Sequence, residues 1–275
     1  MRLSPDGSRV ALEIGDEDND IWVWDLARQT MTRITTDPGL DQGPVWMPDG
    51  HRLLFTSQTG GVPGALFRQS ADGTGTAERL TDGTSVQRAS AVLPDGTAVL
   101  FYQFEDLMLL PFDGAQRPRP VVRTPQLADS GVVSPDDRWL AYVERDAGPP
   151  QVFVRPFPNV DGARVQVSVD GGTQPVWARN SRELFYLGRD GSVMSAAVAA
   201  GTRFSAATPQ RVVPPGYFDG RGLTAPRTYD VSPDGRFLMI KADSAGEGAA
   251  EPAADPRMIV VLNWSAELAR IVPTR

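Results

Sequence analysis

The chain repeats one short sequence motif. In each copy a proline and an aspartate are followed by glycine or a second aspartate, and then by an apolar run. Proline presets the second position of a tight turn, aspartate hydrogen-bonds nearby backbone, and glycine accepts a left-handed backbone. Asp137 replaces the glycine in one copy, and aspartate tolerates the same region. Each copy therefore predicts a tight turn between two strands. The copies are LSPDGSRVAL (3–12), MPDGHRLLF (47–55), LPDGTAVLF (93–101), SPDDRWLAY (134–142) and SPDGRFLMI (232–240).

The spacing of the copies predicts the architecture. Their prolines stand at 5, 48, 94, 135 and 233, so the intervals are 43, 46, 41 and 98 residues. The last interval is about twice the others, and residues 177–186 (WARNSRELFY) fit the frame of a decayed copy with Arg179 in the proline position. Six units of about 40–45 residues, each with several short strands, are typical of propeller blades. We predict an all-β, six-bladed β-propeller with four-stranded antiparallel blades.

The predicted propeller is a single domain over residues 1–275. Its blades are expected at about 1–40, 41–84, 85–127, 128–171, 172–222 and 223–263. The last blade is expected to be incomplete, with strands at 228–231, 237–241 and 258–263 and an exposed edge. A short helix is predicted at 264–271, and the acidic stretch 242–256 is interpreted as a mobile loop. The chain is expected to begin inside a repeat, so that a preceding segment completes the last blade.

Composition excludes several classes of function. The net charge is −7 and no lysine or arginine run occurs, which argues against nucleic acid as a partner. No apolar stretch reaches 18 residues, so no membrane span is predicted. The chain has no cysteine, which removes disulfides, thiol catalysis and cysteine-based zinc sites. We expect a monomer.

Residues suited to catalysis or metal binding are sparse. His51 is the only histidine and follows a turn glycine, so we expect an exposed turn residue rather than a catalytic base. The stretch GDEDND (15–20) resembles the start of a calcium loop, but Ile21 and Ala27 stand where glycine and glutamate are needed. The interpretation is a solvated hairpin. We predict no enzyme activity, no metal and no cofactor.

Two further sets of residues recur with the turns, and both favour structural roles. The turn aspartates occupy one position in every copy, which indicates a shared structural task rather than catalysis. Aromatic residues precede several turns, and we expect them to pack between blades. The aspartates are Asp6, Asp49, Asp95, Asp136 and Asp234, and the aromatic residues are Trp46, Trp177 and Tyr229.

Several stretches of the sequence resemble a known family. PVWMPDG (44–50) and DIWVWDL (20–26) resemble the PD40, or TolB-like, six-bladed β-propeller repeat. The stretches 171–198, 229–240 and 259–268 resemble the C-terminal propeller of bacterial serine/threonine kinases and related sensor proteins. This resemblance implies a bacterial protein. It also implies an upstream kinase or DNA-binding domain with a membrane span, and a periplasmic or extracytoplasmic location for the ring.

The loops that enter the innermost strands form the predicted binding site. In a propeller these loops gather at one mouth of the central channel, where both charge signs and amides suit a peptide, a protein segment or a small polar ligand. TolB-like propellers bind partner proteins, and the resemblance implies the same class of partner. The predicted ligand-binding residues are Asp41, Gln42, Arg88, Asp129, Gln174 and Arg227.

Two alternatives remain at this stage. A metal-dependent propeller enzyme, of lyase or lactonase type, would have to use Asp41 and Asp129, because the predicted ring has no histidine. Bound calcium stoichiometry would separate this enzyme from a binding module. The chain would otherwise be the accessory propeller of a peptidase or a kinase.

Overall fold

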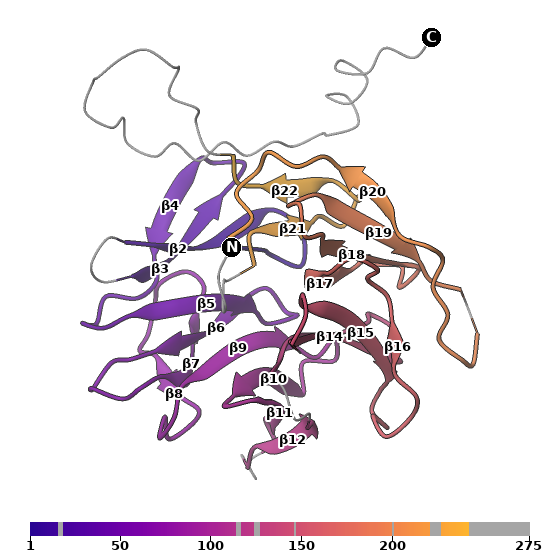
Figure 1. Cartoon of the computed structure of the whole chain (residues 1–275). Helices are drawn as coiled ribbons and strands as arrows, with labels where there is room; N and C mark the ends of the chain where they lie inside the picture. Colours follow the sequence, from indigo (N-terminus) through magenta and orange to yellow (C-terminus); the bar gives the residue numbers. More distant parts are fainter. Residues whose placement is uncertain are drawn as a thin grey trace.

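A computed structural model describes residues 1–15, 19–113, 117–123, 127–145, 147–199, 201–220 and 227–241. Its sheets surround a central axis, and consecutive sheets are neighbours around the ring (Figure 1). Within each sheet the strands follow chain order and pair antiparallel, so each unit is a simple meander. The strand nearest the axis comes first in every unit.

Five sheets have four strands each. The first two are β1 (Arg2–Leu3), β2 (Arg9–Ile14), β3 (Asp20–Asp25) and β4 (Thr30–Arg33), then β5 (Asp41–Trp46), β6 (Arg52–Ser57), β7 (Ala65–Ser70) and β8 (Glu78–Arg79). The third is β9 (Gln87–Val92), β10 (Ala98–Gln103), β11 (Asp106–Pro111) and β12 (Arg119–Val122). The fourth and fifth are β13 (Leu127–Val133), β14 (Trp139–Arg145), β15 (Gln151–Pro156) and β16 (Val165–Gln166), then β17 (Thr173–Trp177), β18 (Glu183–Leu187), β19 (Val193–Ala197) and β20 (Gln210–Val213).

The prediction of six blades and a C-terminal helix is wrong. The described residues form five four-stranded blades. The sixth turn connects the two strands of a smaller sheet, β21 (Tyr229–Val231) and β22 (Phe237–Met239). A turn needs only its two flanking strands, so counting turns counts hairpins rather than complete blades. No helix occurs in the part of the chain that the structure describes. The predicted strand 258–263, the helix 264–271 and the loop 242–256 lie outside the described residues.

The repeated motif forms the same turn in all six units. In each turn the backbone N–H of the fourth residue donates to the carbonyl oxygen of the first, as in Gly7 to Ser4 at 2.8 Å. The decayed copy keeps this bond, from Ser181 to Ala178 at 2.9 Å. Asp137 and Ser181 adopt left-handed φ angles of 56° and 58°, close to the glycines they replace. The turn geometry therefore survives the loss of proline and glycine.

The turns also contact one another around one end of the channel. A Cβ on Gly7 would lie 2.9 Å from Cδ of Pro233, and Gly7 has a φ of +74°. Both close approach and a left-handed backbone therefore require glycine here. A Cβ on Gly50 would lie 3.7 Å from Cδ of Pro5, so the second turn packs on the first in the same way.

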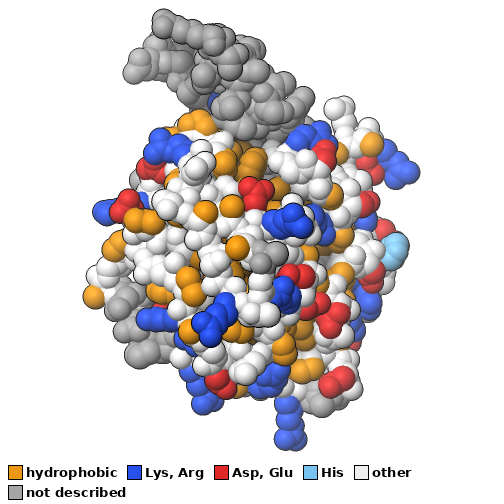
Figure 2. Space-filling view, turned by 90° about the vertical axis from the view of Figure 1, so that its right-hand side faces the viewer, with side chains coloured by type: hydrophobic (Ala, Val, Ile, Leu, Met, Phe, Trp, Pro, Cys, Tyr) orange, Lys and Arg blue, Asp and Glu red, His pale blue; other side chains and the backbone are white. Residues whose placement is uncertain are grey.

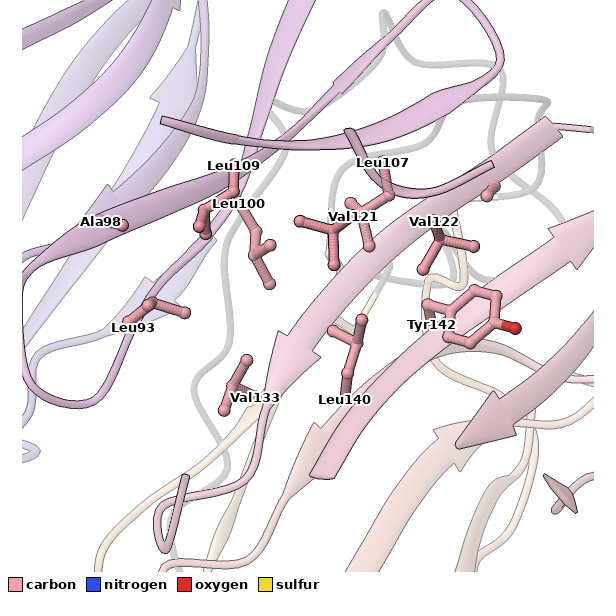
Figure 3. Close-up of a cluster of buried hydrophobic side chains, with 11 residues drawn as sticks. Leu93, Ala98, Leu100, Leu107, Leu109, Val121, Val122, Val133, Leu140 and Tyr142 are labelled. Atoms are coloured by element: carbon pink, nitrogen blue, oxygen red, sulfur yellow. The ribbon is translucent and has the colours of Figure 1, made fainter. Parts of the chain in front are cut away.

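The core is divided between neighbouring sheets. Figure 3 shows the cluster between the third and fourth sheets, where Leu100 and Leu107 lie opposite Leu140 and Tyr142. All four side chains are buried from solvent. The fourth sheet is covered on both faces by its neighbours, so its central strand β14 carries apolar residues on both faces, as in WLAYV.

Aromatic side chains tie adjacent units together through the backbone of the innermost strands. Trp46 Nε1 donates to the Arg2 carbonyl oxygen at 3.0 Å, and Trp177 Nε1 donates to that of Val132 at 3.1 Å. The Tyr229 hydroxyl donates to the Gln174 carbonyl oxygen at 2.9 Å. Each bond satisfies a carbonyl at the free edge of the neighbouring sheet. The prediction that these residues pack between units is confirmed.

Contacts between the first and last sheets close the ring. The Leu3 backbone N–H donates to Asp230 Oδ2 at 2.9 Å in a buried setting, and Arg227 Nη1 donates to Asp230 Oδ1 at 3.1 Å. Leu238 of β22 packs against Val10 and other buried residues of the first sheet. The two sheets share no strand pairing, so this closure depends on these contacts and on the Met1 amino group, which donates to the Arg227 carbonyl oxygen at 2.9 Å.

We expect Asp230→Ala to lower the free energy of unfolding by about 2–3 kcal/mol, because it leaves the buried Leu3 N–H without an acceptor. Asp230→Asn keeps an acceptor oxygen for Leu3 and should cost less. Urea denaturation gives both values, and Asp37→Ala, at an exposed carboxylate, is the control. The importance of this contact is contradicted if Asp230→Ala is as stable as the control.

Candidate functional site

The central channel has two chambers. The first, of about 170 Å³, lies at the mouth where the innermost strands begin, and the second, of about 430 Å³, lies on the side of the turns. Arg2 and Ser90 line both chambers, and Arg2 Nη2 donates to the Ser90 carbonyl oxygen across the channel at 3.0 Å. At the turn end Arg179 Nη2 donates to the Pro5 carbonyl oxygen at 2.8 Å. The first chamber is the candidate site, because the predicted binding residues gather there.

Bulges in the innermost strands shape this chamber. The register of β5, β13 and β17 against the second strands shifts at the same place in each blade, and β9 is also bulged. Three bulge residues have left-handed φ angles, Gly43 at 61°, Ser130 at 56° and Gln174 at 54°. Such a backbone costs a non-glycine residue about 1 kcal/mol or more, and such costs cluster at functional sites. All three residues line the chamber.

The structure brings five of the six predicted residues together. The chamber is lined by Gln42, Arg88, Asp129, Gln174 and Arg227.

Asp41 is the exception. It does not line the chamber, because alternate residues of a strand point to opposite faces and Gln42 takes the inward position. Asp41 is only 1% exposed, and burial raises the pKa of its carboxyl group.

Among the further residues that line the chamber, four have charged or aromatic side chains that were not predicted. Arg2 belongs to β1, whereas Glu13, Tyr102 and Arg145 stand at the ends of second strands. Two of them could have been predicted from the sequence, because Glu13 and Tyr102 both stand eight residues after a turn proline. Register explains this signal, since Tyr102 pairs directly with Arg88 of the innermost strand.

The chamber carries an excess of positive charge. Arg2, Arg88, Arg145 and Arg227 line it, against the carboxylates of Glu13 and Asp129. Arg145 Nε donates to Asp129 Oδ2 at 2.8 Å, and Arg227 pairs with Asp230. Glu13 accepts hydrogen bonds from Asn19 and from the Gly43 backbone.

Arg88 differs from the other three arginines. Its guanidinium has no hydrogen bond or ion pair to any described residue. It is half-buried at the chamber wall, where it can meet an anionic ligand.

Tyr102 and Asp129 lie in the same cluster as Arg88. Burial raises the pKa of the Tyr102 hydroxyl, the negative charge of Asp129 raises it further, and Arg88 opposes both effects. Asp129 is 8% exposed, and its Oδ1 atom is buried with no hydrogen-bond partner. The chamber therefore combines an unpaired cation with an unsatisfied carboxylate oxygen, and both favour a polar ligand.

The described residues contain no group of three or more His, Cys, Asp or Glu side chains placed to hold a metal ion. Asp20, from the calcium-like stretch, pairs with Arg33 at 2.6 Å, and residues 16–18 lie outside the described part. His51 is exposed on its turn, as expected. Over the same described ranges no helix is long and apolar enough to cross a membrane.

Residues 2–110 match a family model described as TolB beta propeller domain, PD40. A TolB homolog of Chlorobium luteolum is 30% identical over 128 residues, which are 46% of this chain and 28% of that protein. Tol-Pal system protein TolB of Helicobacter pylori is 29% identical over 68 residues, 24% of this chain and 16% of that protein. The matched regions thus span less than a third of these relatives' own length.

Solved structures agree in fold. TolB from Acinetobacter baumannii superposes with a TM-score of 0.61 at 22% identity, over 76% of this chain and 53% of that one. The fold is that of a TolB-like β-propeller. Putative TolB from Agrobacterium tumefaciens also gives 0.61, at 18% identity over 85% of each chain. Oligogalacturonate lyase in complex with manganese gives 0.59 at 16% identity, over 89% of this chain and 73% of that one. The TolB-like fold thus occurs with an enzyme as well as with TolB.

We expect Arg145→Ala to lower the free energy of unfolding by about 2–3 kcal/mol, because Asp129 then stays buried without a counter-ion. Arg88→Ala should change it by less than about 0.5 kcal/mol, because Arg88 has no partner to lose. Thermal and urea denaturation of the two variants gives the comparison. Equal destabilisation by both would contradict the assignment of Arg88 as the unpaired arginine.

Proposed function

We propose that this propeller is a non-catalytic binding module that takes a protein or peptide segment at the mouth of the first chamber. The unpaired Arg88 carries the proposal, because a half-buried guanidinium with no internal partner has no evident role in stability. Binding an anionic group would supply the missing partner.

Exposed apolar side chains around the mouth add support. Phe104 is 70% exposed on the tight connection between β10 and β11 and has a left-handed φ of 56°. Large apolar side chains exposed beside a polar pocket are typical of protein-binding surfaces. Five of the six large hydrophobic residues exposed in the described structure lie at strand ends or connections on the mouth side: Ile14, Val86, Phe104, Val169 and Phe218.

The proposal also states where the protein acts and which class of partner it binds. Relatives named TolB come from bacteria, and we place this chain in a bacterium outside the cytoplasm, as a monomeric ring that binds protein rather than nucleic acid. A role as the sensor part of a membrane kinase is the finer form of this proposal. It rests on the resemblance of residues 171–198 to kinase-associated propellers.

We expect a photo-crosslinking residue in place of Phe104 to capture a protein partner in native cells, because this side chain stands exposed beside the chamber. The same residue in place of Met31, which is 46% exposed on the outer strand β4, is the matched control and should capture nothing specific. Mass spectrometry of the adducts identifies the partner. Absence of adducts at position 104, or equal adducts at both positions, would contradict the proposal.

A further inference from the structure

Two arginines from distant parts of the chain lie close together in the first chamber. Arg2, on β1, reaches across the channel, where its Nη2 atom donates to the Ser90 carbonyl oxygen at 3.0 Å. Arg88 stands two residues before Ser90 on the same strand, β9, and lines the same chamber. Neither guanidinium has an ion pair to any residue that the structure describes. The chamber therefore contains two neighbouring cations without a counter-ion.

The remaining charged side chains of the chamber are already bonded. Arg145 pairs with Asp129 at 2.8 Å. Arg227 pairs with Asp230 at 3.1 Å. Glu13 accepts hydrogen bonds from two neutral donors, at 3.0 and 3.2 Å. Because these three carboxylates meet four guanidinium groups, one positive charge is left over. On the outer face in Figure 2, by contrast, basic and acidic side chains are interspersed.

Three uncharged polar side chains of the chamber also lack partners. Gln42, Tyr102 and Ser130 line it, and none of these side chains makes a hydrogen bond to another described residue. Tyr102 pairs directly with Arg88 in the register of β9 and β10, so these two donors stand side by side. The chamber wall therefore offers an amide and two hydroxyl groups beside its two free cations.

Size and chemistry together limit the ligand. The chamber volume is about 170 Å³, whereas pockets for drug-sized ligands hold roughly 300–1,000 Å³. A guanidinium pairs best with a carboxylate or a phosphate, because two of its N–H groups can donate to two oxygens at once. The neutral donors on the wall suit hydroxyl oxygens of the same molecule. These requirements describe a small hydroxylated anion.

We propose that the interior of the first chamber binds a small hydroxylated anion. Its carboxylate or phosphate group pairs with Arg2 and Arg88. Its hydroxyl groups bond to Gln42, Tyr102 and Ser130. This inference goes beyond the proposed function, because the ligand is a small molecule and binds without a protein partner. An anionic group of the protein partner would also use Arg88, so the two ligands exclude one another there.

Isothermal titration calorimetry of the full chain, in a phosphate-free buffer, tests the class of ligand. The carboxylate probes are glycerate and gluconate, and the phosphate probe is glycerol phosphate. Propionate has the charge without the hydroxyl groups, and glycerol has the hydroxyl groups without the charge. We expect a hydroxylated anion to bind about tenfold or more tightly than propionate and glycerol. Comparing the carboxylate probes with the phosphate probe shows which anionic group the site prefers.

Variants of the protein locate the bound anion. Arg88→Ala should weaken binding about tenfold or more, because the anion loses charge-assisted hydrogen bonds, and Arg88→Lys should restore part of the loss. Tyr102→Phe should weaken the hydroxylated probes several-fold and leave propionate unchanged. Arg28→Ala, at an exposed arginine that follows β3, is the matched control. Arg179→Ala should also have no effect, because Arg179 lines the second chamber and not the first. Circular dichroism confirms that each variant folds.

The inference is overturned if no hydroxylated anion binds, if propionate binds as tightly, or if Arg88→Ala binds as tightly as the unchanged chain. Loss of affinity in Arg179→Ala instead would place the ligand in the second chamber and would also overturn it. The crosslink at position 104 tests the proposed function separately. Capture of a partner there without anion binding would leave only the proposed function standing. Anion binding without capture would leave only this inference standing.

Discussion

The structure depends on the contact that joins its first and last sheets. Neighbouring sheets in this ring share no strand pairing, so they are joined by side chains and by single backbone hydrogen bonds, such as the bond from the Asp41 N–H to the Asn19 carbonyl oxygen at 2.8 Å. The junction between the first and last described sheets is where the ring can part. At this junction Asp230 accepts a hydrogen bond from the Leu3 backbone and another from Arg227. Arg227 also lines the first chamber, as does Arg2 from the other side of the junction. The residues that close the ring therefore also build part of the candidate site.

Closure matters for function because the chamber is assembled from separate units. Four of the blades contribute a bulged innermost strand, β5, β9, β13 and β17, and the left-handed residues Ser130 and Gln174 lie at the wall. If the ring opened, these strands would separate and the arginines that line the first chamber would no longer lie close together. At the turn end of the channel Arg179, in the position that proline holds elsewhere, donates to the Pro5 carbonyl oxygen. The bulged strands and the arginine cluster lie at the opposite mouth, where we propose binding.

The sequence predicted the turns and the strands well, because proline, aspartate and glycine fix local backbone without help from distant residues. Even the copy around Arg179 kept its turn. Four of the five predicted residues that line the chamber, Gln42, Arg88, Asp129 and Arg227, stand six residues before the proline of their turn. Gln174 stands five residues before Arg179 and still lines the chamber, whereas Asp41 stands seven residues before Pro48 and does not. The number of full blades was wrong because a turn specifies a hairpin only.

Other parts of the site could not be predicted from the sequence. Arg145 reaches the chamber from a second strand, and its pairing with Asp129 depends on the register of β13 and β14.

Native-state hydrogen exchange at the Leu3 amide tests the central claim that the ring is closed by Asp230. If Asp230 closes the ring, this amide exchanges as slowly as the paired amides of the innermost strands β9 and β13, because it is buried and bonded to Asp230. The amides of β21 then share this protection. Exchange at Leu3 as fast as in an unprotected loop, while β9 and β13 stay protected, would show instead that the ring is open at this junction.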